Sequence, residues 1–339
     1  MARGTVMSLH QASLVPRLGR SRGARWTVTA GSVALAVALA AVAAKHFSRT
    51  SWPLSRGHPG LLVAVGLLFL LAFALKAFGW QRLFAAHERP QSLALAAANG
   101  GASVTGVALP GRFDDVVRIA LVRRSPGCPA GVRTLCLSLV MLGLIDTAAL
   151  APLAAAAAVL PGHATGMRAG LALVAVAGVA AAALVVFLPW LVSSRRLLPF
   201  RLGRWLSPRT TSLRGASQAW ALVSACWLVR AAALFLLLGT LGVGFSVSLA
   251  LLFLCAGAAG AALPVGPGGA AMQAGAGASA LMASGVGASQ AVGVAVAGQV
   301  LGVLCGGSIL VSVALWRSSL RGSFARRMCD PLAGSISGG

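Results

Sequence analysis

Charge is scarce in this sequence of 339 residues, and acidic charge most of all. Charged residues make up 10% of the chain and hydrophobic residues 58%, whereas soluble domains carry roughly 25% charged residues. Two lysines are present, and the five acids are Glu88, Asp114, Asp115, Asp146 and Asp330. This composition excludes an ordinary soluble domain and predicts an integral membrane domain with short polar ends.

Sequence motifs of known enzyme chemistry are also missing. The chain contains no P-loop, nucleophile elbow, HExxH or glycosyltransferase-type paired-aspartate motif. Its six cysteines are scattered, without a CxxC spacing or a disulfide framework, and its histidines show no metal-ligand spacing. We therefore expect no cofactor, no bound metal and no enzymatic activity.

Arginine supplies almost all of the net charge of +23. A strongly basic balance is typical of nucleic-acid binding. Here, however, the arginines fall in short clusters between apolar stretches, which is the pattern of topology signals and of contact with anionic lipid head groups. We expect membrane lipids with anionic head groups as partners, and no nucleic acid.

Six apolar stretches are long enough to cross a bilayer. They lie at residues 27–44, 61–80, 134–160, 169–192, 220–241 and 290–316. The arginine-rich segments place the tail 1–26, the loop 193–215 and the tail 317–339 in the cytoplasm. The stretch 27–44 also fits a signal peptide, because alanine-rich residues precede Lys45. The prediction is a single domain over 27–316 in a bacterial cytoplasmic membrane, with both termini cytoplasmic.

Two further apolar stretches, at 91–133 and 246–287, are interrupted by proline and glycine. The breaks are Leu109-Pro110-Gly111-Arg112 and Leu263-Pro264-Val265-Gly266-Pro267-Gly268-Gly269, and each follows a similar lead-in that begins Ser-Leu-Ala-Leu. Charge follows the first break at once, and a central Arg or Asp costs roughly 2.5–3.5 kcal/mol to insert. The first stretch is therefore predicted to dip into the membrane and return, whereas the second fits either such a hairpin or two full spans.

The order of these stretches predicts a duplicated unit. Residues 61–160 and 220–316 each contain a span, a broken element and a span. The single span 169–192 between them gives the second unit the opposite orientation in the membrane. Inverted repeats with broken helices recur in transporters. Chance similarity between segments rich in alanine, glycine and leucine is the alternative. The predicted fold is an all-α polytopic membrane protein with about six full transmembrane helices and two broken or re-entrant elements.

Residues at the two breaks are candidates for lipid binding. A helix that starts after Pro267-Gly268-Gly269 would offer free N–H groups and the positive end of its dipole to a phosphate, with Gln273 as a further polar group. Near the first break, Arg112 and Arg118 suit bidentate phosphate contact, and Asp114 and Asp115 would either hold them in place or gate them. The alternatives are a simple chain turn at the second break and an interfacial charge cluster at the first.

Asp146 and Arg230 each stand alone inside a predicted span. An unpaired charge in lipid is expensive, so we expect the two residues to pair, or both to face one polar cavity. In the last span, Gly302 and Gly306 form a GxxxG pattern, which predicts close packing of helices.

Both broken motifs resemble those of a known family. Residues 110–118 and 267–269 make the chain similar, from about residue 60 to 316, to the lysylphosphatidylglycerol synthase transmembrane-region, or flippase-like, family of bacterial membrane proteins. Asp115 takes the place of the family's glutamate and Arg118 matches, while Asp114 replaces a glycine. In the later motif the two glycines match, and Gln273-Ala274 occupies the place of the usual acid.

This resemblance implies translocation of a lipid, either anionic or glycan-linked, between the two leaflets. Full-length synthases add a soluble aminoacyl-transferase domain, and the sequence after residue 316 is too short to hold one, so synthesis of lysyl-lipid is not expected. Two other functions stay open: an integral membrane enzyme that acts on lipid-linked sugars, and a non-catalytic membrane partner of a lipid-modifying synthase.

Overall fold

The computed structural model describes residues 57–108, 113–126, 128–160, 164–193, 212–262 and 269–333. Within these ranges, residues 108, 113, 189–193, 262, 269–271 and 318–333 are described by their backbone alone. The predicted stretch 27–44 and the residues Arg112, Pro267 and Gly268 lie outside the described residues.

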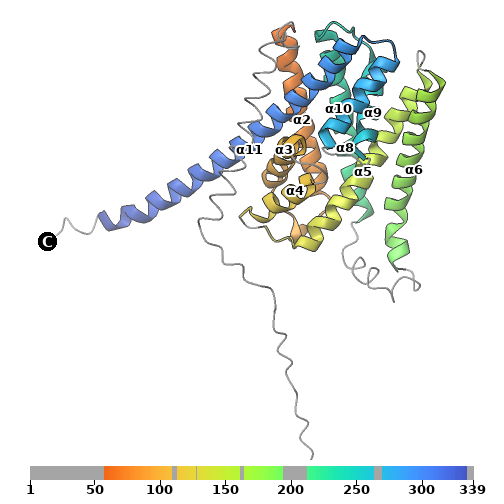
Figure 1. The fold of residues 1–339 in the computed structure, drawn as a ribbon. Helices are drawn as coiled ribbons and strands as arrows, with labels where there is room; N and C mark the ends of the chain where they lie inside the picture. Colours follow the sequence, from red (N-terminus) through yellow and green to blue (C-terminus); the bar gives the residue numbers. More distant parts are fainter. Residues whose placement is uncertain are drawn as a thin grey trace, which may run out of the picture. The chain divides into compact units, whose positions relative to one another are not determined.

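The described chain is helical throughout and contains no strand (Figure 1). Its elements are α2 (Pro59–Gln81), the 3-10 turn η2 (Ala86–Glu88), α3 (Ser92–Ala108), α4 (Phe113–Arg123), α5 (Val132–Val159), α6 (Thr165–Ser193), α8 (Leu213–Thr240), α9 (Val247–Ala262), α10 (Gly269–Ala283) and α11 (Ala288–Ala333). Within the described ranges, α2, α5, α6, α8 and α11 are long and apolar enough to cross a membrane. These five helices confirm five of the six predicted spans.

The long helices pack as antiparallel pairs, α2 against α8 and α5 against α6. Short connections place the end of α2 beside the start of α3, and the end of α4 beside the start of α5. We call the end of the bundle where α2 stops and α5 and α8 start the basic end. Of the described arginines at helix ends and in loops, it holds Arg82, Arg89, Arg123, Arg124, Arg133 and Arg214, and Arg317 of α11 reaches it by donating to Ser125, whereas Arg168 lies at the far end.

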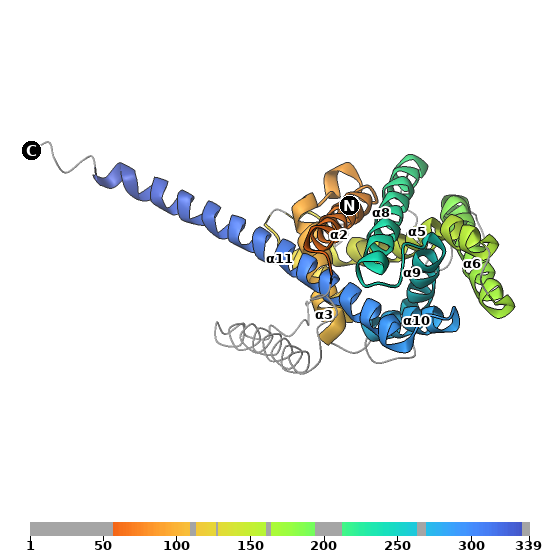
Figure 2. The ribbon, with the colours of Figure 1, turned by 90° about the horizontal axis from the view of Figure 1, so that it is seen from above.

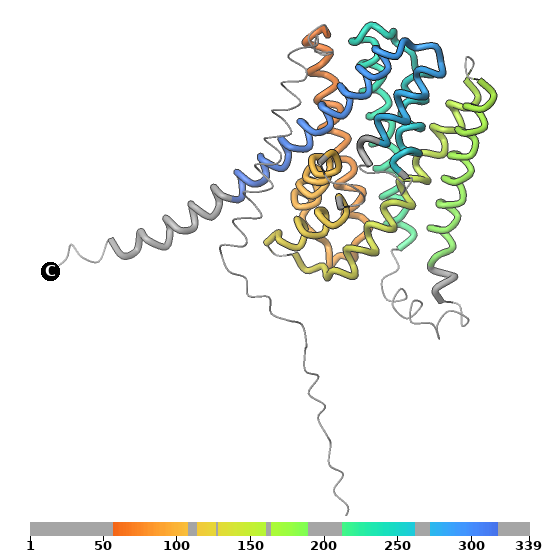
Figure 3. Tube along the Cα trace, in the orientation of Figure 1, coloured from red at the N-terminus to blue at the C-terminus, as the bar shows by residue number. Residues whose placement is uncertain are grey.

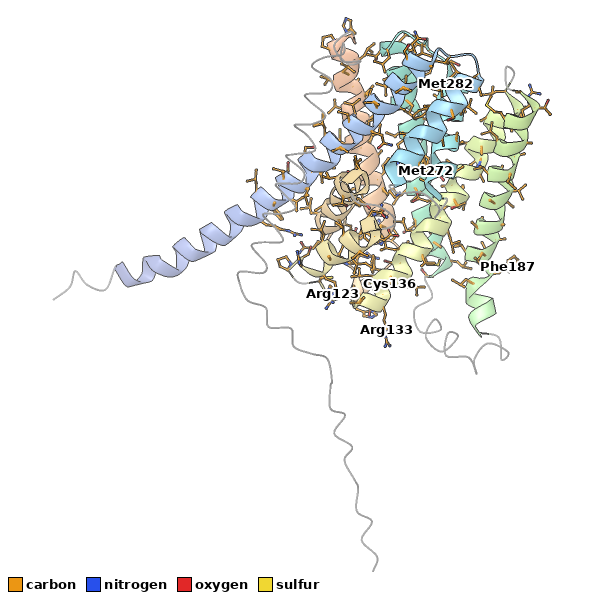
Figure 4. The ribbon with its side chains drawn as sticks, viewed as in Figure 1. Arg123, Arg133, Cys136, Phe187, Met272 and Met282 are labelled. Atoms are coloured by element: carbon orange, nitrogen blue, oxygen red, sulfur yellow. The ribbon has the colours of Figure 1, made fainter. Side chains whose placement is uncertain are left out.

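Helix α6 lies at the edge of the bundle, and much of its apolar surface is uncovered (Figure 2). Leu173, Val176 and Val179 are between 63% and 70% exposed, and Phe187 points away from the other helices (Figure 4). An apolar patch of this kind is costly in water, but it matches the hydrocarbon of a bilayer. The exposed apolar residues of α6 therefore indicate which side of this helix faces lipid.

The two broken elements form helical hairpins, α3 with α4 and α9 with α10. Helix α3 ends at Ala108, before Pro110, and α9 ends at Ala262, before Pro264. Proline removes a backbone donor and disfavours helical geometry in the residue before it, which explains both endings. Helix α4 has 11 residues, α9 has 16 and α10 has 15. All three are shorter than the roughly 20 residues of a full span, so the structure favours a hairpin at the second break.

The hairpins enter the bundle from opposite ends (Figures 1 and 3). The α3–α4 hairpin starts and finishes at the basic end, because α2 delivers the chain there and α5 leaves from there. The α9–α10 hairpin starts and finishes at the far end, between the end of α8 and the start of α11. The inverted relation between residues 61–160 and 220–316 stays a prediction, and this opposed placement is what it requires.

Glycine allows α3 and α11 to touch backbone to backbone. A methyl group on Gly100 would collide with the backbone of Gly306, and one on Gly306 would collide with Gly100 and with the hydroxyl of Ser103. The GxxxG prediction is therefore confirmed at Gly306, whereas Gly302 has open space around its Cα. Close contact of this kind is how helices gain packing energy in lipid, where burial of apolar surface from water is not available.

Candidate functional site

A partly buried ion pair joins α2 to α5 inside the bundle. The Nζ atom of Lys76 lies 2.6 Å from Oδ2 of Asp146, and the two side chains are 13% and 21% exposed. Long side chains on a helix lean toward its N-terminus. Lys76 is near the end of α2, so its ammonium group reaches back from the basic end toward the middle of α5, where Asp146 lies.

Asp146 pairs with Lys76 instead of the predicted Arg230, and the alternative prediction, that Asp146 and Arg230 face one polar cavity, stays a prediction. The carboxylate of Asp146 is shared by Lys76 and by the indole N–H of Trp227, whose Nε1 donates to Oδ1 at 3.2 Å. Arg230, one turn further along α8, has its guanidinium carbon 5.4 Å from the ring centre of Trp227 and 5.9 Å from that of Phe73. Trp227 therefore stands between the two predicted partners.

These five side chains, Phe73, Lys76, Asp146, Trp227 and Arg230, form what we call the mid-bundle cluster. Two cations and one acid give it a formal charge of +1. Arg230 is held by aromatic faces rather than by a carboxylate, and its buried Nε atom has no hydrogen-bond partner in the described part of the chain. Arg230 is partly exposed, and no carboxylate of the described residues pairs with it, so the cluster carries one positive charge in excess.

A second, neutral polar contact joins the same two helices. The indole Nε1 of Trp80 donates to Oγ of Ser138 at 2.9 Å, and Ser138 donates in turn to the carbonyl of Leu135 at 2.8 Å. Trp80 is fully buried and Ser138 nearly so. Because buried polar groups cost free energy unless they are paired, this contact fixes α2 against α5 on the basic-end side of Lys76.

The charged residues of α4 form a compact cluster of their own. Nη1 of Arg118 lies 2.7 Å from Oδ1 of Asp115, and Nη2 lies 3.4 Å from Oδ2 of Asp114. Both acids belong to the first turn of α4, where the helix dipole favours negative charge. The two acids thus contact both terminal nitrogens of Arg118, which is the contact required if they hold this arginine in place. We call Asp114, Asp115 and Arg118 the α4 cluster, and its formal charge is −1.

The second broken motif contributes mainly packing where it is described. Helix α10 begins at Gly269, in agreement with the predicted start after the Pro-Gly-Gly sequence. Gln273 lies one turn later, and its Cγ atom and its backbone pack against Gly257 of α9. Gln273 therefore helps to hold the hairpin closed.

The sequence analysis missed three of the polar groups that the structure places inside the bundle. Lys76 was visible as one of only two lysines, inside the predicted span 61–80, but it was not singled out. Trp227 carried no signal, since tryptophan is common at membrane interfaces. Asn99 of α3 is 3% exposed, and neither of its amide atoms has a hydrogen-bond partner among the described residues.

Comparison with known families decides the identity of the chain. Residues 24–309 match the family described as lysylphosphatidylglycerol synthase TM region. The chain belongs to this family. The matched region of this lysylphosphatidylglycerol synthase TM region protein covers the predicted stretch 27–44, both hairpins and the whole mid-bundle cluster. Neither curated proteins nor solved structures gave a match.

As a member of the lysylphosphatidylglycerol synthase TM region family with five described helices able to span a bilayer, the chain is a multi-pass membrane protein. The family assignment confirms the resemblance that residues 110–118 and 267–269 indicated. In the structure, the Asp115 and Arg118 positions of the first motif are in direct contact.

Proposed function

We propose that this protein translocates an anionic lipid, or a glycan-linked lipid with an anionic phosphate, across the bacterial cytoplasmic membrane without changing it chemically. The single observation that carries this proposal is the excess cation of the mid-bundle cluster, near the middle of helices that can span a membrane. Charged residues at that depth are expensive and mark pathways for substrates or ions.

The chemistry of the cluster selects an anionic head group. A lipid phosphate carries one negative charge, which would neutralise the cluster. The guanidinium of Arg230 is suited to bidentate contact with phosphate oxygens. Lys76 would exchange part of its contact with Asp146 for the phosphate, so that neither Asp146 nor Arg230 lacks a partner of opposite charge while the lipid is bound. The acyl chains would stay in the bilayer, along the exposed apolar faces of the bundle.

Alternating access is the movement that the opposed hairpins support. The α3–α4 hairpin enters from the basic end and the α9–α10 hairpin from the far end. In transporters with inverted repeats, rocking of one repeat against the other opens a central site to each side in turn. We propose the same relation between residues 61–160 and 220–316, with the mid-bundle cluster as the central site.

The distribution of arginine sets the proposed orientation. Arg123 and Arg133 lie together at the basic end (Figure 4), with the other arginines named above. Because Lys and Arg concentrate on the cytoplasmic side of membrane proteins, we place the basic end in the cytoplasm. This orientation puts the C-terminus on that side, and together with the predicted span 27–44 it puts the N-terminus there as well.

A leaflet-exchange assay tests the proposal. The protein is reconstituted into vesicles that contain phosphatidylglycerol with a fluorescent head-group label, and dithionite reports the label in the outer leaflet. We expect lipid exchange with the wild-type chain and an exchange rate about tenfold lower with Arg230→Gln. A factor of about ten corresponds to the free energy of about one charge-assisted hydrogen bond. Arg168→Gln removes the same charge at the far end and is the matched control.

The same assay with labelled phosphatidylcholine measures the preference for an anionic head group. We expect slower exchange of this zwitterionic lipid, with no effect of Arg230→Gln. Equal exchange of phosphatidylglycerol in wild-type vesicles, Arg230→Gln vesicles and protein-free vesicles would refute the proposal.

A further inference from the structure

A separate cavity of about 330 Å³ lies at the basic end, between the loop after α2 and the start of α8. Its wall includes three arginines, Arg82, Arg89 and Arg214, together with Ser212 and Gln218, and no acidic residue. We call these five residues the arginine pocket. Its volume falls within the roughly 300–1,000 Å³ of small-molecule sites, and it shares no residue with the mid-bundle cluster or the α4 cluster.

The loop that forms one wall is fixed in place. Gln81, the last residue of α2, donates from Nε2 to the carbonyl of Pro90 at 2.9 Å, which closes the loop onto the helix end. Leu83 and Phe84 anchor it from within, at 7% and 4% exposure. Arg82 and Arg89 therefore project from a short, tied loop, which lowers the entropy that binding a ligand would cost.

The start of α8 forms the opposite wall. Ser212 caps this helix by accepting a hydrogen bond from the backbone N–H of Gly215 at 3.1 Å. Arg214 and Gln218 are four residues apart and so share one face of the helix. The positive end of the dipole of a long helix adds to the arginine charge at this point.

The pocket holds three cations without a counter-ion. None of the three arginines makes an ion pair with a described residue, and Glu88, the acid nearest to Arg89 in the chain, is not part of the wall. The three arginines are exposed to solvent, and an anion bound among them would lower the repulsion between their like charges. The N–H groups of a guanidinium can donate two parallel hydrogen bonds to the oxygens of a phosphate. The side-chain amide of Gln218 can donate a further hydrogen bond to the same phosphate.

We propose that the arginine pocket binds a phosphate group, supplied either by the head group of an anionic lipid or by a soluble phosphate compound. This site goes beyond the proposed translocation, because it lies at the end of the bundle and uses other residues. Arg82 follows Lys76 on the same helix by about 9 Å of axial rise, so a phosphate held here is positioned next to the path toward the mid-bundle cluster.

Binding to the purified full chain in an uncharged detergent tests the pocket. The probes are dihexanoyl-phosphatidylglycerol, dihexanoyl-phosphatidylcholine, glycerol 3-phosphate and inorganic phosphate, measured by calorimetry. For the variant Arg82→Gln/Arg89→Gln/Arg214→Gln, we expect the Kd of the bound probe to rise about a hundredfold, at about fivefold for each partly solvated arginine.

The control removes three other arginines from the same end of the molecule. Arg123→Gln/Arg124→Gln/Arg133→Gln makes the same change in net charge with exposed residues outside the pocket. We expect its Kd to stay within about threefold of the wild-type value, since only the long-range field changes. Size-exclusion profiles and thermal unfolding check that both variants fold. If the triple pocket variant does not fold, the single loop variant Arg89→Gln replaces it in the binding measurement.

The probes separate the two sources of phosphate. Binding of the short-chain phosphatidylglycerol alone identifies a lipid head group, whereas binding of glycerol 3-phosphate or inorganic phosphate as well identifies a soluble compound. An equal rise in Kd in the pocket variant and the control variant would show that the probe responds to the overall positive charge and not to a site, and would overturn the proposal. Absence of binding of every probe to the wild-type chain would overturn it as well. Leaflet exchange by a pocket variant that no longer binds phosphate would leave the proposed function intact.

Discussion

The mid-bundle cluster and the α4 cluster contain the same kinds of residue but opposite balances of charge. In the first, one acid pairs with only one of two cations, across three helices; in the second, two acids hold one arginine within three to four residues of a single helix. The α4 cluster pairs both terminal nitrogens of its own arginine with carboxylates, although its buried Nε has no partner among the described residues, and its acids receive support from the helix dipole. The mid-bundle cluster leaves Arg230 without a carboxylate among the described residues, so of the two clusters it is the one for which we propose an anionic ligand.

Solvent access separates the two clusters further. Asp114 and Asp115 are 29% and 38% exposed, whereas Lys76 and Asp146 are 13% and 21% exposed. Breaking a pair therefore leaves a charge in different surroundings. Loss of one partner from a buried pair costs far more than loss from a pair that water can reach. Substitutions in both clusters measure this difference.

The largest expected effect is that of Asp146→Asn. The change leaves Lys76 and Arg230 as two cations without an acid inside the bundle, so we expect the free energy of unfolding to fall by about 3 kcal/mol. Denaturation of the purified chain in detergent, followed by tryptophan fluorescence, measures the loss.

A double substitution tests whether the unpaired charge is the cause. Lys76→Met/Asp146→Leu removes both members of the ion pair and keeps side chains of similar volume, and replacement of a buried pair in this way is often close to neutral. We expect most of the stability to return. A double variant as unstable as Asp146→Asn would show that packing around the site, and not the stranded charge, determines the loss.

The helices of this protein were predictable because length and composition determine them. Long apolar runs end at arginine clusters, and Pro110 and Pro264 end the short helices, so α2, α5, α6, α8 and α11 follow from the sequence. The contact between Asp115 and Arg118 was also within reach, since residues three apart on a helix face each other.

The partner of Asp146 was not predictable in the same way. Which side chain meets it depends on how α2 and α8 are rotated about their axes, and Lys76 and Arg230 both lie on helices that border α5. Trp227 decides the outcome, because its indole N–H takes the second carboxylate oxygen. The arginine pocket was hidden for a related reason: Arg82 and Arg214 are 132 positions apart in the numbering and meet only through the packing of α2 on α8.

A smaller effect is expected from Arg118→Ala. The two acids that it leaves are partly hydrated and lie at a helix N-terminus, so we expect a loss of about 1 kcal/mol in the free energy of unfolding. Leaflet exchange should stay within about threefold of the wild-type rate if the α4 cluster is structural. A loss as large as that of Arg230→Gln would instead place Arg118 in the binding of the lipid, as the family resemblance implies, and would remove the contrast between the two clusters.

The smallest effect is expected where α2 and α5 are joined without charge. Trp80→Phe keeps an aromatic ring in the same buried place but removes the hydrogen bond to Ser138, whose hydroxyl still donates to Leu135. A neutral hydrogen bond contributes about 1 kcal/mol, and we expect a loss of that order in detergent denaturation, together with an unchanged preference for phosphatidylglycerol. Trp80→Phe/Ser138→Ala removes both polar partners and should be more stable than Trp80→Phe. If instead Trp80→Phe destabilises the chain as strongly as Asp146→Asn, then the rigid joining of α2 to α5, and not the balance of charge, is what both contacts provide.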